Sequence, residues 1–385
     1  MKWAIKQIEA GELNSRAVYL KFVVNMKSIY LVILLLLATV YTTVAQEKSF
    51  MILGDIHYDL MEDHDMEWLK TKPDDLRQVK EYTQITKEIW PTFSNHLRDI
   101  VKTYSPKVEA VVQLGDLSEG LAGTEALADQ MARNTVKGVD AVNMPVPWIV
   151  IKGNHDITGP GAKEAFDKHY VQMFQDQLKR KDITSANYAH QIGENLFVAL
   201  DPWDNREDLL DELEKNLSSS DAKFKFLMVH EPIIPINERC WHLYRNDQKK
   251  RDRLLEIVAR NKAIVLTAHL HLYAIVKRET DHGPIIQLSF NSVIRDLERT
   301  STKKVYTKYG WNLAVDFPDW QPETLAQRIK WLDEESRYVT SFKQQELPGY
   351  GLITTNEDNG EIFMEYYSAI NKTPYERICI SDLYK

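Results

Sequence analysis

Five short apolar runs, each followed at once by polar residues, constrain most strongly how this chain can fold. The runs are rich in β-branched residues and too short for helices, so they predict buried strands. They cover 50–53, 108–114, 148–151, 225–229 and 263–267. Helix-like spacing of apolar residues occupies much of the sequence between them, at 74–104, 124–142, 162–181, 206–217 and 247–261. Strands that alternate with helices predict a layered α/β domain.

Side chains that bind metals follow each of these runs. In open α/β sheets, ligands bind where strands end at their carboxyl edge. Imidazole and carboxylate without thiolate suit iron, zinc or manganese, and fit hydrolysis better than a structural zinc site. Two ions about 3.5–4 Å apart clamp the attacking and leaving oxygens of a phosphoryl transfer. The seven candidate ligands are Asp55, His57, Asp116, Asn154, His230, His269 and His271.

The ordered motifs D-x-H, G-D, G-N-H-D, H and A-H-x-H resemble those of the calcineurin-like metallophosphoesterases, over about residues 49–272. The resemblance implies an α/β fold, a four-layer α/β/β/α sandwich, with two metal ions (Fe, Mn or Zn). It implies hydrolysis of a phosphate mono- or diester by a metal-bridging hydroxide, with His155 as general acid. Carried over by motif, the first ion is held by Asp55, His57 and His271, the second by Asn154, His230 and His269, and Asp116 bridges them.

Because the chain departs from the patterns of the known subfamilies, the resemblance is to the superfamily as a whole. Ala268 stands where glycine is usual, and the arginine typical of protein serine/threonine phosphatases is missing after Asp116. The ligating tyrosine of purple acid phosphatases is also absent at its usual offset. Glu119 is expected either to orient His155 from behind or to be a simple turn residue. Asp156 is either a helix cap or loop residue, or a residue that supports the ligands.

Other polar clusters are expected to be structural. The cluster at 62–65 looks like a metal site but has no strand end to position it, which favours a solvated loop. Asp201 is expected in a turn. The basic and aromatic residues after His230 either line a phosphate-ester pocket or pack on the surface, and packing is favoured; they are Arg239, His242, Tyr244 and Arg245.

Composition and motifs limit the function classes. The 385 residues carry a formal net charge of −8, which argues against a stable nucleic-acid partner. A nuclease or nucleotide phosphodiesterase of the same superfamily remains an alternative, as does a non-catalytic metal-containing binding or scaffold protein. A P-loop, a serine elbow and a dinucleotide fingerprint are absent. Whether Cys240 and Cys379 pair is left open.

The first 45 residues read as a targeting region. A short basic stretch, an apolar core and a small-residue site at 26–45 predict a signal peptide, preceded at 1–25 by an upstream start extension. A secreted or periplasmic protein is expected, with an N-terminal membrane anchor as the alternative, although the apolar run is shorter than the ~20 residues that span a bilayer. Residues 46–296 are expected to form the catalytic domain, with a hairpin at 273–289 in its second sheet. Residues 297–385 are expected to be an extension with a β-hairpin, packed on the core.

Overall fold

The computed structural model describes residues 47–302, 304–315 and 323–385, and the predicted signal peptide and start extension lie outside these ranges. Residues Glu47–Lys385 form one compact unit. Among the described residues, every helix is too short or too polar to cross a membrane.

The first sheet combines strands from both ends of the described chain. Its order is β14 (Glu376–Cys379), β13 (Ile362–Ser368), β12 (Gly349–Asn356), β1 (Glu47–Leu53), β2 (Val108–Gln113) and β3 (Trp148–Val150). β1, β2 and β3 are parallel, whereas β12 runs antiparallel to β1 and forms the predicted hairpin with β13.

The second sheet has eight strands, with a parallel centre and antiparallel edges. Its order is β10 (Val305–Tyr306), β11 (Val339–Gln345), β8 (Tyr273–Arg278), β9 (Ile285–Ser289), β7 (Ile264–Thr267), β6 (Phe224–Met228), β5 (Asn195–Ala199) and β4 (Tyr188–Ile192). β5, β6, β7 and β9 are parallel, and β8 closes the predicted hairpin with β9. The segment 297–385 thus contributes strands to both sheets.

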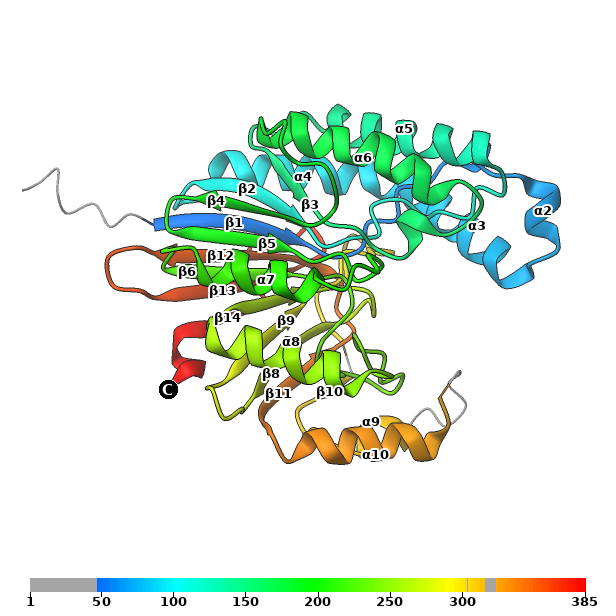
Figure 1. Ribbon diagram of the computed structural model, residues 1–385. Coiled ribbons are helices and arrows are strands. Elements are labelled where there is room, and N and C mark those ends of the chain that lie inside the picture. The colour runs from blue at the N-terminus through cyan, green and yellow to red at the C-terminus, as the bar shows by residue number, and fades with distance from the viewer. Residues whose placement is uncertain (1–46, 303, 316–322) are drawn as a thin grey trace, which may run out of the picture. The chain divides into compact units, whose positions relative to one another are not determined.

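Helices cover the outer faces of the two sheets. Figure 1 shows α4, α5 and α6 over the first sheet and α7 and α8 over the second. The helices are η1 (Met61–Asp63), α2 (Met66–Lys70), α3 (Pro73–Glu88), α4 (Trp90–Thr103), α5 (Glu125–Ala141), η2 (His155–Ile157), α6 (Ala162–Leu178), α7 (Leu209–Ser218), α8 (Gln248–Arg260), α9 (Asn312–Val315), α10 (Leu325–Ser336) and η3 (Ile380–Tyr384). Two sheets flanked by helices confirm the predicted α/β sandwich.

Successive side chains in the strands of the second sheet point to opposite faces, and both faces are buried. In β6, Phe226 points into the core between the sheets, whereas its neighbour Leu227 belongs to the cluster under α7 and α8. Across the interface Phe50 of β1 meets Phe197 of β5 edge to face, with ring centroids 4.8 Å apart. In the sequence, such strands are continuous apolar runs because neither face of the sheet contacts water.

The carboxyl ends of the parallel strands meet at one edge of the sandwich. The Gly54 amide donates to Ser292 Oγ at 3.0 Å and so ties the end of β1 to the loop after β9. Loops that leave β1, β2, β3, β6 and β7 at this edge carry all seven candidate ligands. The fold therefore brings residues that are more than 200 positions apart in sequence to one place.

Two local predictions can be compared directly with the structure, and one of them was wrong. Pro91 was expected to kink or divide the helix at 74–104, and the segment is two helices, α3 and α4, that meet at Ile89. The solvated loop predicted at 62–65 is wrong for Asp63 and His64, which are both buried. Asp63 accepts hydrogen bonds from Gln130 and Asn134, so side chains from α5 replace the expected water.

Candidate metal centre

Four candidate ligands have a backbone conformation that is rare for residues with a side chain. His57, Asp116, His269 and His271 have φ values of 50°, 51°, 67° and 52°. The left-handed region costs residues other than glycine of order 1–3 kcal/mol and persists where the surrounding structure over-determines it. These sharp turns at strand ends aim the side chains at a common centre.

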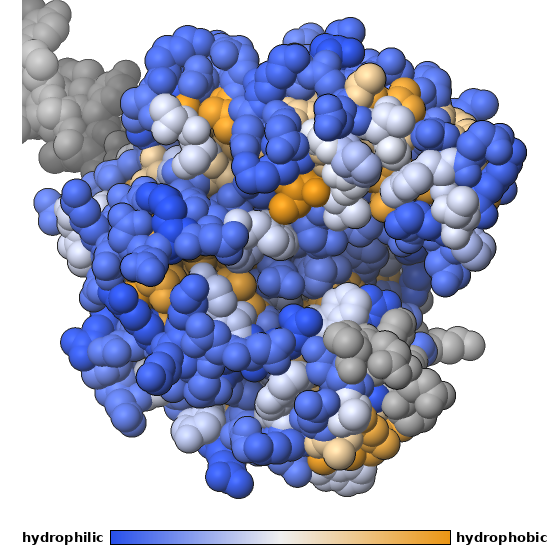
Figure 2. All heavy atoms as spheres, turned by 45° about the vertical axis from the view of Figure 1, so that its right-hand side comes forward, coloured by the Kyte–Doolittle hydropathy of each residue, from blue (hydrophilic) through white to orange (hydrophobic). Residues whose placement is uncertain are grey.

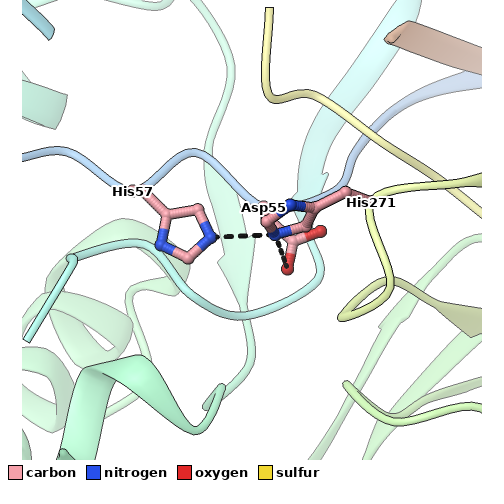
Figure 3. Close-up of side chains that lie close together, drawn as sticks. All are labelled: Asp55, His57 and His271. Atoms are coloured by element: carbon pink, nitrogen blue, oxygen red, sulfur yellow. Dashed lines mark hydrogen bonds and ion pairs between the residues drawn. The ribbon is translucent and has the colours of Figure 1, made fainter. Parts of the chain in front are cut away.

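The first ligand cluster joins the ends of β1 and β7. Nε2 of His57 lies 3.1 Å from Nε2 of His271, and Oδ1 of Asp55 lies 3.7 Å from the same nitrogen of His271. Figure 3 shows the two imidazoles turned toward each other with the Asp55 carboxylate beside them. The ligand atoms of these three residues all lie within 4.8 Å of one another, as a metal site requires.

Burial sets the charge of this cluster. It lowers the pKa of His57 well below its usual value and that of His271 to about 3, so both imidazoles are neutral at neutral pH. Burial also raises the pKa of Asp55 to about 8. Neutral imidazole is the form that ligates metals, and a buried carboxylate needs a cation close by to ionise.

The second cluster joins the ends of β2, β3, β6 and β7. Nε2 of His230 lies 3.1 Å from Oδ2 of Asp116, 3.2 Å from Oδ1 of Asn154 and 3.3 Å from Nδ1 of His269. Asp116 Oδ2 also lies 3.9 Å from Nε2 of His57. Asp116 therefore stands between the two clusters.

Hydrogen bonding fixes which nitrogen of His230 faces the cluster. Its Nδ1 donates to the Leu114 carbonyl at 2.7 Å, which leaves Nε2 for a metal. Burial lowers the pKa of His230, but the charge and hydrogen bond of Asp116 outweigh it and raise that pKa to about 10. Within the protein alone, the proton of His230 thus balances the Asp116 carboxylate.

These features fit two metal ions. Nε2 of His57 and Nε2 of His271 lie 3.1 Å apart, close enough for both to ligate one ion. Oδ2 of Asp55 is buried without a hydrogen-bond partner, which is costly unless it binds something. The ligands are carboxylate, amide oxygen and imidazole, a set that suits divalent first-row metals.

Two glycines let the loops approach this closely. A Cβ on Gly153 would lie 2.1 Å from the amide nitrogen of Asp116, and a Cβ on Gly115 would lie 2.6 Å from Nδ1 of His230. Real Cβ atoms are essentially never found so close to other atoms. The glycines of the G-D and G-N-H-D motifs are therefore required by the contact between the loops.

His155 and Glu119 lie against the first cluster. Nδ1 of His155 donates to the backbone carbonyl of Glu119 at 2.8 Å and lies 3.4 Å from the Glu119 carboxylate. Oε2 of Glu119 is 2.8 Å from Nδ1 of His57, on the side of that ring opposite the ligand nitrogen. Burial first, and then the charges of Asp59 and Asp116, raise the pKa of Glu119 well above its usual value. Glu119 thus contacts two rings of the centre.

Asp156 joins two of the motif loops. Its carboxylate accepts from the backbone amide of Gly153 at 2.8 Å, and from the amide and hydroxyl of Ser118 at 2.9 and 3.1 Å. Burial raises its pKa to about 6. The side chain therefore links the loop after β3 to the loop after β2, next to Asn154 and Asp116.

Several residues around the centre escaped sequence analysis. Tyr82 on α3 stacks on His57, with ring centroids 4.1 Å apart, and Gln78 on the same helix places Nε2 3.5 Å from Nε2 of His155. Lys152, directly before Gly153, pairs with Asp201 at 2.5 Å, so Asp201 is an ion-pair partner as well as a turn residue. Only the helical spacing of 78 and 82 was available as a signal, and it does not say what the helix faces.

A cleft of about 850 Å³ opens over the centre. Its lining includes Asp116, Asn154, His155, His269 and His271 together with Gln78 and Tyr82. Arg239 and Trp241 also line it, with the Arg239 guanidinium 4.9 Å from the Trp241 ring centroid. Figure 2 shows that side chains on this face are mostly hydrophilic, as suits a polar substrate.

Most of the remaining residues after His230 are structural. His242 is buried and its Nδ1 donates to the Cys240 carbonyl, while Arg245 pairs with Glu323 at 2.7 Å. Neither His242 nor Arg245 lines the cleft, whereas Arg239 does; His242 packs in the interior and not on the surface as predicted. Cys240 and Cys379 are both free thiols in the described part of the chain.

Comparison with known families gives a match over residues 48–273, to calcineurin-like phosphoesterases. The chain belongs to the calcineurin-like phosphoesterase family. Membership makes it a metal-dependent phosphoesterase, and its two ligand clusters fit the two metal ions that were predicted. A comparison with curated protein sequences finds no match.

Several solved structures resemble this calcineurin-like phosphoesterase. The purple acid phosphatase PPD1 from yellow lupin (Lupinus luteus) seeds is 12% identical with a TM-score of 0.49, over 87% of this chain and 54% of that one, so this chain spans about half its length. GAP50, the anchor in the inner membrane complex of Plasmodium, is 12% identical with a TM-score of 0.46, over 86% and 88%. A dimetal phosphatase from Danio rerio is 12% identical with a TM-score of 0.45, over 86% and 98%.

Proposed function

We propose that this protein hydrolyses phosphate mono- or diesters with His155 as the general acid. The observation that carries the proposal is the orientation of His155 in the cleft that both ligand clusters share. Its Nδ1 faces the Glu119 carbonyl at 2.8 Å, and a carbonyl oxygen only accepts hydrogen bonds. The Nδ1 proton is therefore fixed, and Nε2 is the atom that gains and loses a proton.

The proton on Nε2 of the imidazolium would pass to the leaving oxygen as its bond to phosphorus breaks. General acids of this kind typically contribute about 10²–10⁴-fold to the rate. The backbone amide of His155 also donates to Oδ1 of Asp116 at 2.8 Å, so the acid and the proposed bridging ligand are held in one arrangement. A side-chain nucleophile is not needed in this reaction.

Seven residues are proposed to hold the metal ions. Metal ions at such a centre supply activation of water and neutralisation of charge on the phosphoryl oxygens. Asp55, His57 and His271 support one ion through their short mutual distances, and Asn154, His230 and His269 support the other. Asp116, within reach of both groups, is proposed to be shared.

The test is hydrolysis of 4-nitrophenyl phosphate and bis(4-nitrophenyl) phosphate by the full chain loaded with Mn²⁺, Zn²⁺ or Fe²⁺. The two rates give the ester class. Chelation is expected to abolish turnover, and His155→Ala is expected to lower kcat by about 10²–10⁴-fold with a smaller change in KM. As a matched control, His282→Ala removes an exposed histidine that does not line the cleft and is expected to leave the rates unchanged.

Two results would contradict the proposal. Metal-loaded protein that hydrolyses neither ester would favour the binding or scaffold role considered from the sequence. Unchanged turnover of His155→Ala on both esters would remove His155 as the acid while leaving the phosphoesterase assignment in place.

A further inference from the structure

Helix α3 presents one face to the metal centre, although it carries none of the five motifs. Gln78 and Tyr82 are four residues apart and so lie on the same side of the helix. Tyr82 lies flat against His57, with the ring planes 13° apart, and Gln78 approaches His155. Both residues line the cleft. The face of α3 toward the centre therefore carries an amide and an aromatic ring in contact with two different motif histidines.

Buried hydrogen bonds hold α3 in this position. The Asp59 backbone amide donates to Thr86 Oγ1 at 2.9 Å, and the Thr83 hydroxyl donates to the Asp59 carboxylate. The same carboxylate pairs with His64 at 2.6 Å, and the other ring nitrogen of His64 lies 3.0 Å from the Leu121 carbonyl oxygen. The helix is thus attached to the loop that carries His57 and to the loop that carries Glu119. Groups supported in this way keep a defined geometry for a substrate.

When His155 is neutral, its contact with Gln78 has one consistent proton arrangement. Nδ1 of His155 is occupied by the Glu119 carbonyl, so Nε2 of the neutral ring is an acceptor. The Gln78 amide N–H therefore points toward Nε2, at a distance of 3.5 Å. That distance is long for a hydrogen bond, and it leaves room for a third atom. One oxygen atom can lie about 2.9 Å from two nitrogens that are this far apart.

We propose that Gln78 is a catalytic residue that donates a second hydrogen bond to the leaving-group oxygen. The inference rests on the proposed function, in which His155 protonates that oxygen. When the P–O bond breaks, the oxygen takes the bonding pair and receives the Nε2 proton of His155. The Gln78 amide keeps both of its protons and stabilises the charge that develops on the oxygen. A fixed donor aimed at developing charge is worth most in a cleft that limits water.

The loss of rate on replacing Gln78 is expected to depend on the basicity of the leaving group. Phenolate is a far stronger base than 4-nitrophenolate, so it develops more charge that requires stabilisation. For phenyl esters of the ester class that the protein hydrolyses, Gln78→Leu is expected to lower kcat/KM by about 10–10²-fold. For the matching 4-nitrophenyl ester the loss is expected to be below about threefold. Gln78→Met, with an unbranched apolar side chain of similar length, is expected to give the same pattern if the leucine variant does not fold.

Gln84→Leu is the matched control, because Gln84 is on the same helix but is exposed and pairs with Glu88. Both esters should be hydrolysed at wild-type rates by this variant. A second readout does not depend on activity. In metal-free protein, the imidazole ¹⁵N signal of His155 Nε2 is expected to shift in Gln78→Leu and to stay in place in Gln84→Leu.

The outcomes separate the inference from the proposed function. If the wild type hydrolyses neither ester, or if His155→Ala loses nothing with the phenyl ester, the proposed function fails. If His155→Ala hydrolyses the phenyl ester more slowly, but Gln78→Leu lowers kcat/KM for both esters equally or not at all, only the role of Gln78 is overturned. An unchanged His155 Nε2 signal in Gln78→Leu would likewise overturn it.

Discussion

Oε2 of Glu119 lies 2.8 Å from Nδ1 of His57, whose other ring nitrogen belongs to the first ligand cluster. A carboxyl group close to the outer nitrogen of a metal-binding imidazole makes the ring a better ligand. Here the two atoms are close, although their angles do not meet hydrogen-bond geometry. Glu119 is fully buried, so water does not weaken this interaction. His57, Glu119 and His155 also meet the distance criterion for a metal group, but Glu119 contacts His57 on the side away from the other ligands.

Glu119→Gln is expected to weaken metal binding at the first cluster by about 10–100-fold, because a cation held by His57 favours the ionised form of Glu119, which an amide cannot adopt. The measurement is a titration of metal-free protein with Zn²⁺ followed by calorimetry. Glu207→Gln, at an exposed position, should bind as the wild type does. Equal affinities for the two variants would show that Glu119 does not act through His57.

Gly153→Ala is expected to disrupt the centre, since the added Cβ would lie 2.1 Å from the Asp116 amide and 2.2 Å from its Oδ1. Relief of this clash requires a backbone shift that costs at least about 1–3 kcal/mol and moves Asp116. Both metal affinity and the unfolding midpoint in urea should fall. Gly283→Ala is the control, because no atom lies within 4 Å of that Cβ. Its φ of +111° should lower stability alone and leave metal affinity intact.

Glu335→Gln is expected to destabilise the fold by about 3–5 kcal/mol, because it leaves two buried arginines without their anion. Glu335 on α10 contacts Arg251 of α8 at 2.5 Å and Arg278 of β8 at 2.8 Å. The neighbouring Glu334 has a side chain that is 52% exposed, so Glu334→Gln should change the unfolding free energy by less than about 0.5 kcal/mol.

The same variant should alter the dependence of stability on pH. Burial raises the pKa of Glu335, but the charges of Arg251 and Arg278 outweigh it and lower the pKa below 4.5. The stabilisation is therefore fully present above pH 4.5 and is lost as the pH falls through the lower, folded-state pKa. Urea unfolding at pH 7 and at pH 3.5 should show a smaller difference between wild type and Glu335→Gln at the acid pH. An equal difference at both would contradict the ion pair.

Asp59→Asn is expected to lower stability most in mildly acidic solution. Burial lowers the pKa of His64, but its hydrogen bond to the Asp59 charge outweighs it and raises the pKa above 6.5. This contribution is fully present below pH 6.5 and disappears as the pH rises through the raised pKa. The difference in unfolding free energy from wild type should thus be larger at pH 5.5 than at pH 9. Asp281→Asn, at an exposed position, should show no such trend.

Sequence periodicity predicted a layered α/β domain, and the resemblance carried by the ordered motifs implied the sandwich and the grouping of the ligands. An apolar run followed by Gly-Asp or Gly-Asn-His places those side chains at a strand end, and parallel strands end at one edge. The places of β4, β11 and β14 were not predicted, since strand neighbours are chosen by packing across the whole chain. The cluster at 62–65 was misjudged because its partners, Gln130 and Asn134, lie on a helix about 70 positions later.

The sequence by itself determined which residues gather at one edge of the sandwich, since five motifs occur in order and each follows an apolar run. Only the tertiary structure decided what surrounds them. Glu119 behind His57, Gln78 beside His155 and the pairing of β12 with β1 all join segments whose approach no local pattern encodes. The physical reason is that ligand positions follow from backbone turns at strand ends, whereas supporting contacts depend on how whole helices and sheets pack.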